Sequence, residues 1–430
     1  MSPRTAAPKG ARTAGEAEGA PMSSGTRVPP AALVVVAAGV AASLHVGKLP
    51  PAVPALQAQL QVSLLEAGFL LSLVQVAGML LGMVAGLAAD SIGLRRSMLA
   101  GLLLLSAASA AGSLADHLAA PVAWLLAWRA VEGLGFLLAV MPGPGLIRRL
   151  APAGADKAAM GLWGAYMPVG VALALLLGPT VIARGGWALW WQALAAASAV
   201  AAFGLWRAVA PDPRQALAGA GSAQPWSQRL ALTVRTPRAW GAAAAFGLYA
   251  AQWIAVIGFL PTICVAAGLG ASATAGLTAL AAALNMVGNV VGGRLLQRGW
   301  APVHLLRLGF AAMGVAAVAA FAGWNGAPAG ALSLLPRYVA ICLFSLCGGM
   351  VPATLFMLAV RVAPTSSTVS TTVGLMQQAS SLGQFVAPPV VAWVAHRAGG
   401  WQWTWACTLA CSLAGIAVGT ALASARREPG

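Results

Sequence analysis

Twelve apolar segments, each close to the length that crosses a bilayer, constrain this chain more than any other feature. A transmembrane helix needs roughly 20 consecutive apolar residues. The segments lie at 31–52, 64–88, 97–116, 121–147, 158–182, 187–207, 239–262, 272–295, 302–323, 330–360, 367–394 and 401–423. Of the 430 residues, 60% are hydrophobic and only 8% are charged, and the mean hydropathy is +0.82. The sequence therefore predicts an all-α integral membrane protein with twelve transmembrane helices.

The basic residues are distributed unevenly around these segments. Of the 25 lysines and arginines, 20 lie in the two tails and in alternate loops, whereas two lie in the opposite loops. Basic residues collect on the cytoplasmic side of membrane proteins. We therefore expect both termini in the cytoplasm. The net charge of +16 then reflects membrane topology, and we expect no nucleic-acid partner.

The longest polar segment lies between the sixth and the seventh span and so divides the chain into two groups of six spans. It predicts a disordered cytoplasmic tail at 1–28, an N-terminal six-helix bundle at 29–207, a cytoplasmic linker at 208–238, a C-terminal six-helix bundle at 239–423 and a cytoplasmic tail at 424–430. The first tail lacks a signal peptide with a cleavage site, so the first span should be retained. Met22 precedes this span closely, and a start of translation there is a further hypothesis.

The two groups of six spans resemble each other, which indicates an internal repeat. Matching residues recur at offsets that grow slowly from 206 to 214, as small loop insertions would cause. The pairs are Gly93 with Gly299, Arg129 with Arg337, Gly170 with Gly383 and Gly186 with Gly400. Two related six-helix bundles with a binding site between them are a common transporter architecture.

A charged turn, GLAADSIGLRR, joins the second and third spans. Glycine favours the positive backbone angles of a tight reversal, and an aspartate can accept hydrogen bonds from the free amides where the next helix begins. The turn resembles the G-x-x-x-D-x-x-G-x-[RK]-[RK] loop of the major facilitator superfamily, in which it acts as a conformational latch. The matching residues are Gly86, Asp90, Gly93, Arg95 and Arg96. The alternative is an ordinary hairpin stop, and the second half has Leu296 where Asp90 would align.

The resemblance extends to the fourth span and supplies the expected architecture. Arg129, Gly133 and Gly135 resemble the superfamily motif R-x-x-x-G-x-G. Membership implies two pseudo-symmetric six-helix bundles and a substrate site between them near the midplane. A weaker resemblance, over about 30 residues from Met141 to Trp163, links the chain to bacterial cyanate and nitroimidazole-type carriers.

Arg129 is the most informative charge within a span. It lies about eight residues into its helix, roughly 12 Å deep at 1.5 Å per residue, so it is too deep to belong to a loop. A charge at this depth normally faces a cavity or a partner. We expect Arg129 to contact substrate, or else to be neutralised by Glu132 one turn later.

Three further ionisable residues have two interpretations each. Arg337 aligns with Arg129, and the two could flank a central cavity and favour an anion, or Arg337 could anchor the end of its span. His45 and Lys48 share a helix face. Lys48 either contacts substrate or snorkels to the surface. Glu132 and His45 are the candidates for proton coupling, although His45 could equally be a satisfied core imidazole.

Neutral polar residues at helical spacing supply the remaining candidates for substrate binding. Asn and Gln in membrane helices either line a cavity or hold helices together. These candidates are Gln75, Tyr166, Gln252, Trp253, Asn285, Asn289, Gln377 and Gln384.

No enzyme constellation is present in the sequence. The four histidines are scattered, the five cysteines lie in apolar runs without metal-ligand spacing, and there is no nucleotide-binding P-loop. We expect neither a cofactor nor a metal. Without a P-loop, transport driven by ion or solute gradients is the mechanism that remains.

The sequence predicts a secondary transporter of the bacterial inner membrane that works by alternating access. The preferred substrate is a small organic or inorganic anion taken up with protons, and a monomer is expected. One alternative is an efflux carrier for amphipathic drugs or metabolites. Another is a membrane sensor that keeps the fold without transporting.

Overall fold

The computed structural model of the chain describes residues 28–152, 159, 162–212, 225–323, 331–365 and 368–424. Within these ranges it leaves undescribed the side chains of 85–92, 148, 226, 297, 331–333, 360, 370, 423 and 424. The expectations for the tail before residue 28, for Met22 and for the side chain of Asp90 therefore lie outside the described part. Every regular element in the described ranges is a helix.

The first half of the chain contains the helices up to Ala208. They are α1 (Pro30–Gly47), α2 (Leu49–Leu60), α3 (Leu64–Ser72), η1 (Leu73–Gln75), α4 (Val76–Ile92), α5 (Leu94–Gly112), η2 (Ala115–His117), α6 (Pro121–Val140), α7 (Gly143–Leu150) and α9 (Tyr166–Ala208).

The second half contains the remaining helices. They are α11 (Trp226–Val234), α12 (Pro237–Ala266), α13 (Ala271–Gln297), α14 (Pro302–Phe321), α15 (Ala331–Val362), α16 (Val369–Ala398), η4 (Trp401–Trp403) and α17 (Thr404–Ser424). The short helix α11 lies within the stretch that the sequence predicts to be a linker.

The described helices account for the twelve predicted spans. Ten continuous helical stretches in the described part are long and apolar enough to cross a membrane. One of them, α9, contains two spans, because its backbone leaves the helical region at Gly185 and Gly186 (φ +76°). The helix α16 is a further span of 30 residues whose hydropathy is lowered by Ser, Thr and Gln. The prediction of twelve transmembrane helices is confirmed.

The first span is longer than the sequence predicts. The predicted boundary lies at residue 52, yet helix continues past Pro50, Pro51 and Pro54 to Leu60. Two of these prolines lie in the first turn of α2, where proline is tolerated because its missing N–H has no partner in the helix. Lys48, at the junction of α1 and α2, therefore lies in the middle of a helical run and not near its end.

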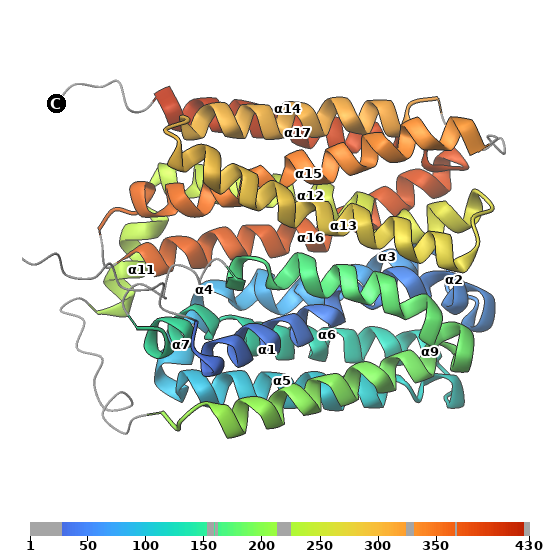
Figure 1. The fold of residues 1–430 in the computed structure, drawn as a ribbon, viewed down its shortest axis with the longest axis horizontal. Coiled ribbons are helices and arrows are strands. Elements are labelled where there is room, and N and C mark those ends of the chain that lie inside the picture. The colour runs from blue at the N-terminus through green and yellow to red at the C-terminus, as the bar shows by residue number, and fades with distance from the viewer. Residues whose placement is uncertain are drawn as a thin grey trace, which may run out of the picture.

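Figure 1 shows the two halves side by side, with α14, α17, α15 and α12 on one side and α1, α5 and α6 on the other. Helix α16 packs against α3 and α4 of the first half, α13 packs against α9, and α12 packs against α2. The C-terminal end of α17, α7 and α11 all lie at one end of the molecule, which we call the terminal side (Figure 1).

The internal repeat is visible in helix packing. A Cβ atom at Gly170 would collide with the carbonyl oxygen of Val40, and a Cβ at Gly383 would collide with that of Gly247. These glycines are 213 positions apart, and their partners are 207 apart, within the range of offsets predicted from sequence. Each half therefore brings its first and fifth spans together at an equivalent glycine.

The halves are closed together on the side away from the termini. There the second part of α12, from Ile254 to Leu260, is buried around its whole circumference. Helices α2 and α3 of the first half lie at that end of the molecule (Figure 1), where α2 packs against α12 and α3 packs against α16.

We predict that Gly170→Ala and Gly383→Ala each lower the free energy of unfolding by about 1–3 kcal/mol, because each added methyl group overpacks a helix contact. The control is Gly276→Ala in α13, where a Cβ meets no atom within 4 Å. Thermal unfolding in detergent would measure the difference. Equal midpoints for all three variants would show that these close contacts do not hold the spans together.

Candidate functional site

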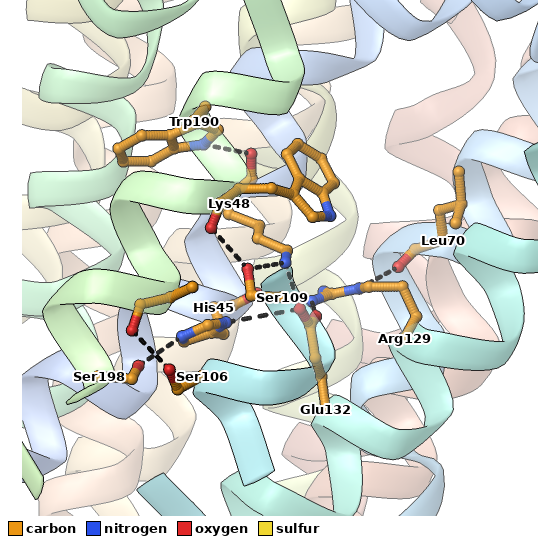
Figure 2. Close-up of polar contacts among 11 residues, drawn as sticks. His45, Lys48, Leu70, Ser106, Ser109, Arg129, Glu132, Trp190 and Ser198 are labelled. Carbon is orange, nitrogen blue, oxygen red and sulfur yellow. Dashed lines mark hydrogen bonds and ion pairs between the residues drawn. The ribbon is translucent and has the colours of Figure 1, made fainter. Parts of the chain in front are cut away.

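A cluster of ionisable side chains is buried inside the first half. Lys48 is fully buried, and Glu132 is 1% exposed. The Lys48 ammonium donates to the Glu132 carboxylate and, at 3.0 Å, to the Ser109 hydroxyl (Figure 2). It also lies 4.4 Å from the ring centroid of Trp191. Lys48 therefore binds inward through hydrogen bonds and a cation–π contact, and the structure does not support snorkelling to the surface.

Arg129 binds the other oxygen of the same carboxylate. Its Nη1 lies 2.5 Å from Glu132 Oε2, so the predicted i, i+3 pair forms. The guanidinium also donates to the carbonyl oxygens of His45 at 2.8 Å and Leu70 at 3.0 Å (Figure 2). It thus ties α6 to α1 and α3, and only its Nη2 has no hydrogen-bond partner.

His45 joins the cluster from α1. Its Nε2 lies 2.7 Å from the Ser198 hydroxyl on α9, and its Nδ1 lies 3.6 Å from Glu132 Oε1 (Figure 2). Nδ1 has no hydrogen-bond partner. A protonated imidazole would pair with Glu132, whereas a neutral one with its proton on Nε2 would donate to Ser198.

The second half has an uncharged version of this contact. Ser412 donates to Gln252 at 2.9 Å. Gln252 lies 207 positions after His45 and Ser412 lies 214 after Ser198, so the pairs are equivalent in the repeat. The positions equivalent to Lys48 and Glu132 are apolar alanines in the second half, Ala255 and Ala340. Among the described residues, the fully buried charges therefore lie in the first half, and Arg337, at the position equivalent to Arg129, is only partly buried.

One carboxylate partly compensates the two cations of the cluster. Two cations face one carboxylate inside the membrane-spanning region, and His45 adds a charge only when protonated. Removing ions from water costs several kcal/mol each, which only close pairing offsets. Glu132 therefore holds the cluster together, because both cations depend on its two oxygens.

A separate cavity of about 140 Å³ lies between the halves. Among the residues that the structure describes, no charged side chain lines it. Its walls are largely aromatic, and its polar groups are amides and hydroxyls. The aromatic residues are Phe136, Tyr166, Phe246, Tyr249, Trp253 and Phe356, and the polar ones are Gln75, Asn289, Gln377, Ser380, Ser381 and Gln384.

Hydrogen bonds cross between the halves at one wall of this cavity. Gln75 donates to Gln384 at 3.1 Å, and Ser381 donates to Gln75 at 3.3 Å. Gln378 donates to the carbonyl oxygen of Met79 at 2.8 Å. A neutral polar seam thus joins α4 and η1 to α16.

The sequence from residue 31 to residue 377 matches the family model of the Major Facilitator Superfamily. This match covers well over half of the chain. The chain belongs to the major facilitator superfamily. It is therefore a membrane transporter by family.

Two solved structures share the fold of this superfamily member. One is a bacterial homolog of the human lysosomal transporter Spinster in an inward-facing and occupied conformation, at 15% identity and a TM-score of 0.72, covering 92% of this chain and 95% of that chain. The other is a D-xylose–proton symporter, at 14% identity and a TM-score of 0.68, covering 91% and 96%. No curated protein matches the sequence significantly.

The structure separates the predicted site residues of this superfamily member into groups. The cavity contains Gln75, Tyr166, Trp253, Asn289, Gln377 and Gln384. The buried cluster contains Arg129, Glu132, His45 and Lys48, none of which lines the cavity. Gln252 faces Ser412, and Asn285 accepts from Tyr249 at 3.1 Å behind the cavity wall.

Arg337 belongs to neither group. It donates to the carbonyl oxygens of Ala320 at 2.8 Å and Ala322 at 3.2 Å, where α14 ends. Carbonyls at the end of a helix lack partners within it, and a basic side chain can satisfy them. This is the geometry of the anchor, and the pair of arginines facing each other across the cavity does not form.

Sequence reasoning missed several members of both sites. Ser109 and Ser198 lie in apolar runs, where a single hydroxyl gives no signal of a charged partner. Trp190 also escaped notice, and it is 3% exposed and donates to the Lys48 carbonyl oxygen at 3.1 Å. Phe246 and Tyr249 could have been found, since they share a helix face with Trp253.

The charged turn is held by a residue that the family motif does not include. Gly93 has the predicted positive φ, at +99°. The carboxylate of Asp212, just after α9, accepts from the backbone amides of Arg95 and Arg96, both at 3.2 Å. It also pairs with Arg149 at 2.8 Å. Burial raises the pKa of Asp212, but these hydrogen bonds outweigh burial and hold the pKa below its usual value.

We predict that Glu132→Gln lowers the free energy of unfolding by about 3–5 kcal/mol, because it leaves two buried cations without their anion. The double variant Lys48→Met/Glu132→Gln should recover part of this loss by removing one cation. Asp116→Asn, at an exposed carboxylate, is the control. Denaturation in mixed micelles would measure the values. A loss no larger than that of the control would contradict the central role of Glu132.

We predict that Asp212→Asn lowers stability by about 1 kcal/mol at neutral pH. The folded-state pKa of Asp212 lies below its ordinary value of 3.8, so its contribution is complete above that value and is lost as the pH falls through the folded-state pKa. The difference between wild type and variant should shrink on acidification. A double-mutant cycle with Arg149→Ala should show non-additive losses, and additive losses would exclude the pair as the cause.

Proposed function

We propose that this chain is a secondary transporter that carries a small uncharged solute by alternating access, and that the buried cluster couples transport to protons. The observation that supports this most directly is the separation of charge from the cavity. The solute cavity between the halves has only neutral lining among the described residues. The charged groups lie inside the first half, paired with each other.

The separation favours an uncharged solute over the anion predicted from sequence. An anion in a desolvated site needs a cation or several convergent donors. The two arginines expected to provide that charge are committed elsewhere, Arg129 to Glu132 and Arg337 to the end of α14.

Alternating access is supported by two equivalent halves that pack around one shared cavity. The halves are sealed on the side away from the termini, and the cavity residues Gln377, Phe356 and Asn289 lie in the parts of their helices nearer the terminal side. The neutral seam of Gln75, Ser381 and Gln384 can exchange partners when the halves rock, without exposing a charge.

Proton coupling is assigned to Glu132 and His45. Glu132 is the one carboxylate within the described spanning segments that is paired with both a lysine and an arginine, so protonating it would release both cations. The unpartnered Nδ1 of His45 at 3.6 Å can accept or deliver that proton. Arg129 donates hydrogen bonds to carbonyl oxygens of α1 and α3. A change in its pairing with Glu132 would therefore alter the contacts of helices next to the cavity.

The proposal includes a bacterial inner-membrane location with both termini in the cytoplasm, a division into bundles at 29–207 and 239–423, and function as a monomer. On this orientation the described state is closed toward the periplasm.

An efflux carrier is the second candidate. Six aromatic side chains line the cavity, which suits amphipathic compounds. Both candidate functions use the same neutral site, and they differ in the direction in which the solute is transported. Overexpression of an efflux carrier should lower susceptibility to several unrelated toxic compounds, whereas an uptake carrier should not.

We predict that proteoliposomes accumulate an uncharged solute when an inward proton gradient is imposed, and that His45→Gln abolishes accumulation while exchange of labelled for unlabelled solute persists. Glutamine occupies the equivalent position in the second half, where it bonds serine, so this variant keeps the contact with Ser198 but cannot titrate. Labelled uptake and counterflow would be measured on the same vesicles.

Gln252→Asn is the matched control, because it changes the equivalent contact with Ser412 in the second half, where neither partner is ionisable. If small anions accumulate and uncharged solutes do not, the proposal of a neutral substrate is wrong. If His45→Gln accumulates solute as well as wild type, His45 has no part in coupling.

A further inference from the structure

The polar groups of the cavity are largely occupied by one another. Gln75, Ser381 and Gln384 bond across the seam, and Gln384 also donates to Ser380 at 3.2 Å. Asn289 donates to the backbone oxygen of Asn285 at 3.0 Å. These groups hold the walls of the cavity to one another, which uses part of their hydrogen-bonding capacity.

Two polar side chains in the cavity make no hydrogen bond with another described residue. They are the Tyr166 hydroxyl, on α9 of the first half, and the Gln377 amide, on α16 of the second half. Tyr166 is 9% exposed, and Gln377 is half-buried. Both groups are therefore available to exchange hydrogen bonds with a solute that enters the cavity.

The rest of the lining consists mainly of flat aromatic surface. Phe246 stacks parallel to Tyr249, with centroids 6.2 Å apart, and meets Phe356 edge to face at 5.4 Å. Trp253 is fixed by its hydrogen bond to Ser345 at 3.2 Å. Packed aromatic walls recognise a flat ring through stacking and edge contacts.

From these observations we infer that the solute is a planar aromatic ring bearing an uncharged amide or lactam group, held by Gln377 and Tyr166. The inference rests on the proposed function and names its substrate class. The amide of Gln377 can donate to the carbonyl oxygen of such a group and accept from its N–H. The Tyr166 hydroxyl donates to the same carbonyl oxygen, so one functional group contacts both halves.

The same lining disfavours the other classes of small solute. A sugar presents a hydroxyl on nearly every carbon, and each needs a partner when it is desolvated. The two free groups here are too few for that. A cation would find aromatic faces but no carboxylate in the described lining, and it would lie in the first half's field, where two cations face one carboxylate.

Binding to purified protein tests the substrate class with benzamide as the reference and three comparison probes. Benzamide has the ring and the amide, benzoate replaces the amide with a charge, cyclohexanecarboxamide replaces the flat ring, and glucose is a polyhydroxylated solute. We expect benzamide to bind at least about tenfold more tightly than each of the other three, a difference of about 1.4 kcal/mol. Calorimetry would give the dissociation constants.

Two variants locate the contacts. Gln377→Leu and Tyr166→Phe should each weaken benzamide binding about five- to tenfold, in line with the loss of a hydrogen bond to a partly buried partner. Their controls are Gln402→Leu and Tyr338→Phe, whose side chains bond Ala398 and Leu277 outside the cavity. Unchanged binding in both cavity variants would overturn the assignment even if benzamide binds.

The outcomes separate this inference from the proposed function. If glucose or cyclohexanecarboxamide binds as well as benzamide and accumulates under a proton gradient, the ring-amide class is wrong while the neutral transporter stands. If only benzoate binds, both proposals fail.

Discussion

The carboxylate of Glu132 is the constraint on which the first half depends. It lies within the membrane-spanning region, where ions are stable only in close pairs, and its two oxygens hold Lys48 and Arg129 separately. Arg129 also donates hydrogen bonds to backbone carbonyl oxygens of α1 and α3. Four helices therefore meet at one acid, and any change in its charge alters their contacts together.

The second half is built on the same plan without the charges. Its first and fifth spans meet at Gly383 as those of the first half meet at Gly170, and Gln252 bonds Ser412 as His45 bonds Ser198. Alanines replace Lys48 and Glu132, whereas Arg337, which replaces Arg129, binds carbonyl oxygens at the end of α14. Such asymmetry allows one half to respond to protons while both halves contribute neutral walls to a shared cavity, which is the division of roles that the proposed mechanism requires.

The sequence was sufficient for features that depend on local pattern and insufficient for those that depend on contacts between distant helices. Hydrophobic length predicted the twelve spans, and the turn motif predicted the positive φ of Gly93. Helical spacing predicted the Arg129–Glu132 pair. The sequence predicted that the first span ends at residue 52, whereas helix continues past three prolines to Leu60.

Residues far apart in sequence account for the other differences. Asp212 binds the start of α5 from 117 positions away along the chain, and no local signal marks that contact. The sequence offered Arg129 and Arg337 as a symmetrical pair, but symmetry of position does not fix where a side chain points, and Arg337 instead binds carbonyls at the end of α14.

The most direct test of the central claim is the charge that moves with the solute, measured as current across a supported membrane loaded with the protein. A neutral solute carried together with a proton must move net positive charge in the direction of the solute, and the current should disappear in His45→Gln. An electroneutral flux, as an anion and a proton would give, would contradict the account.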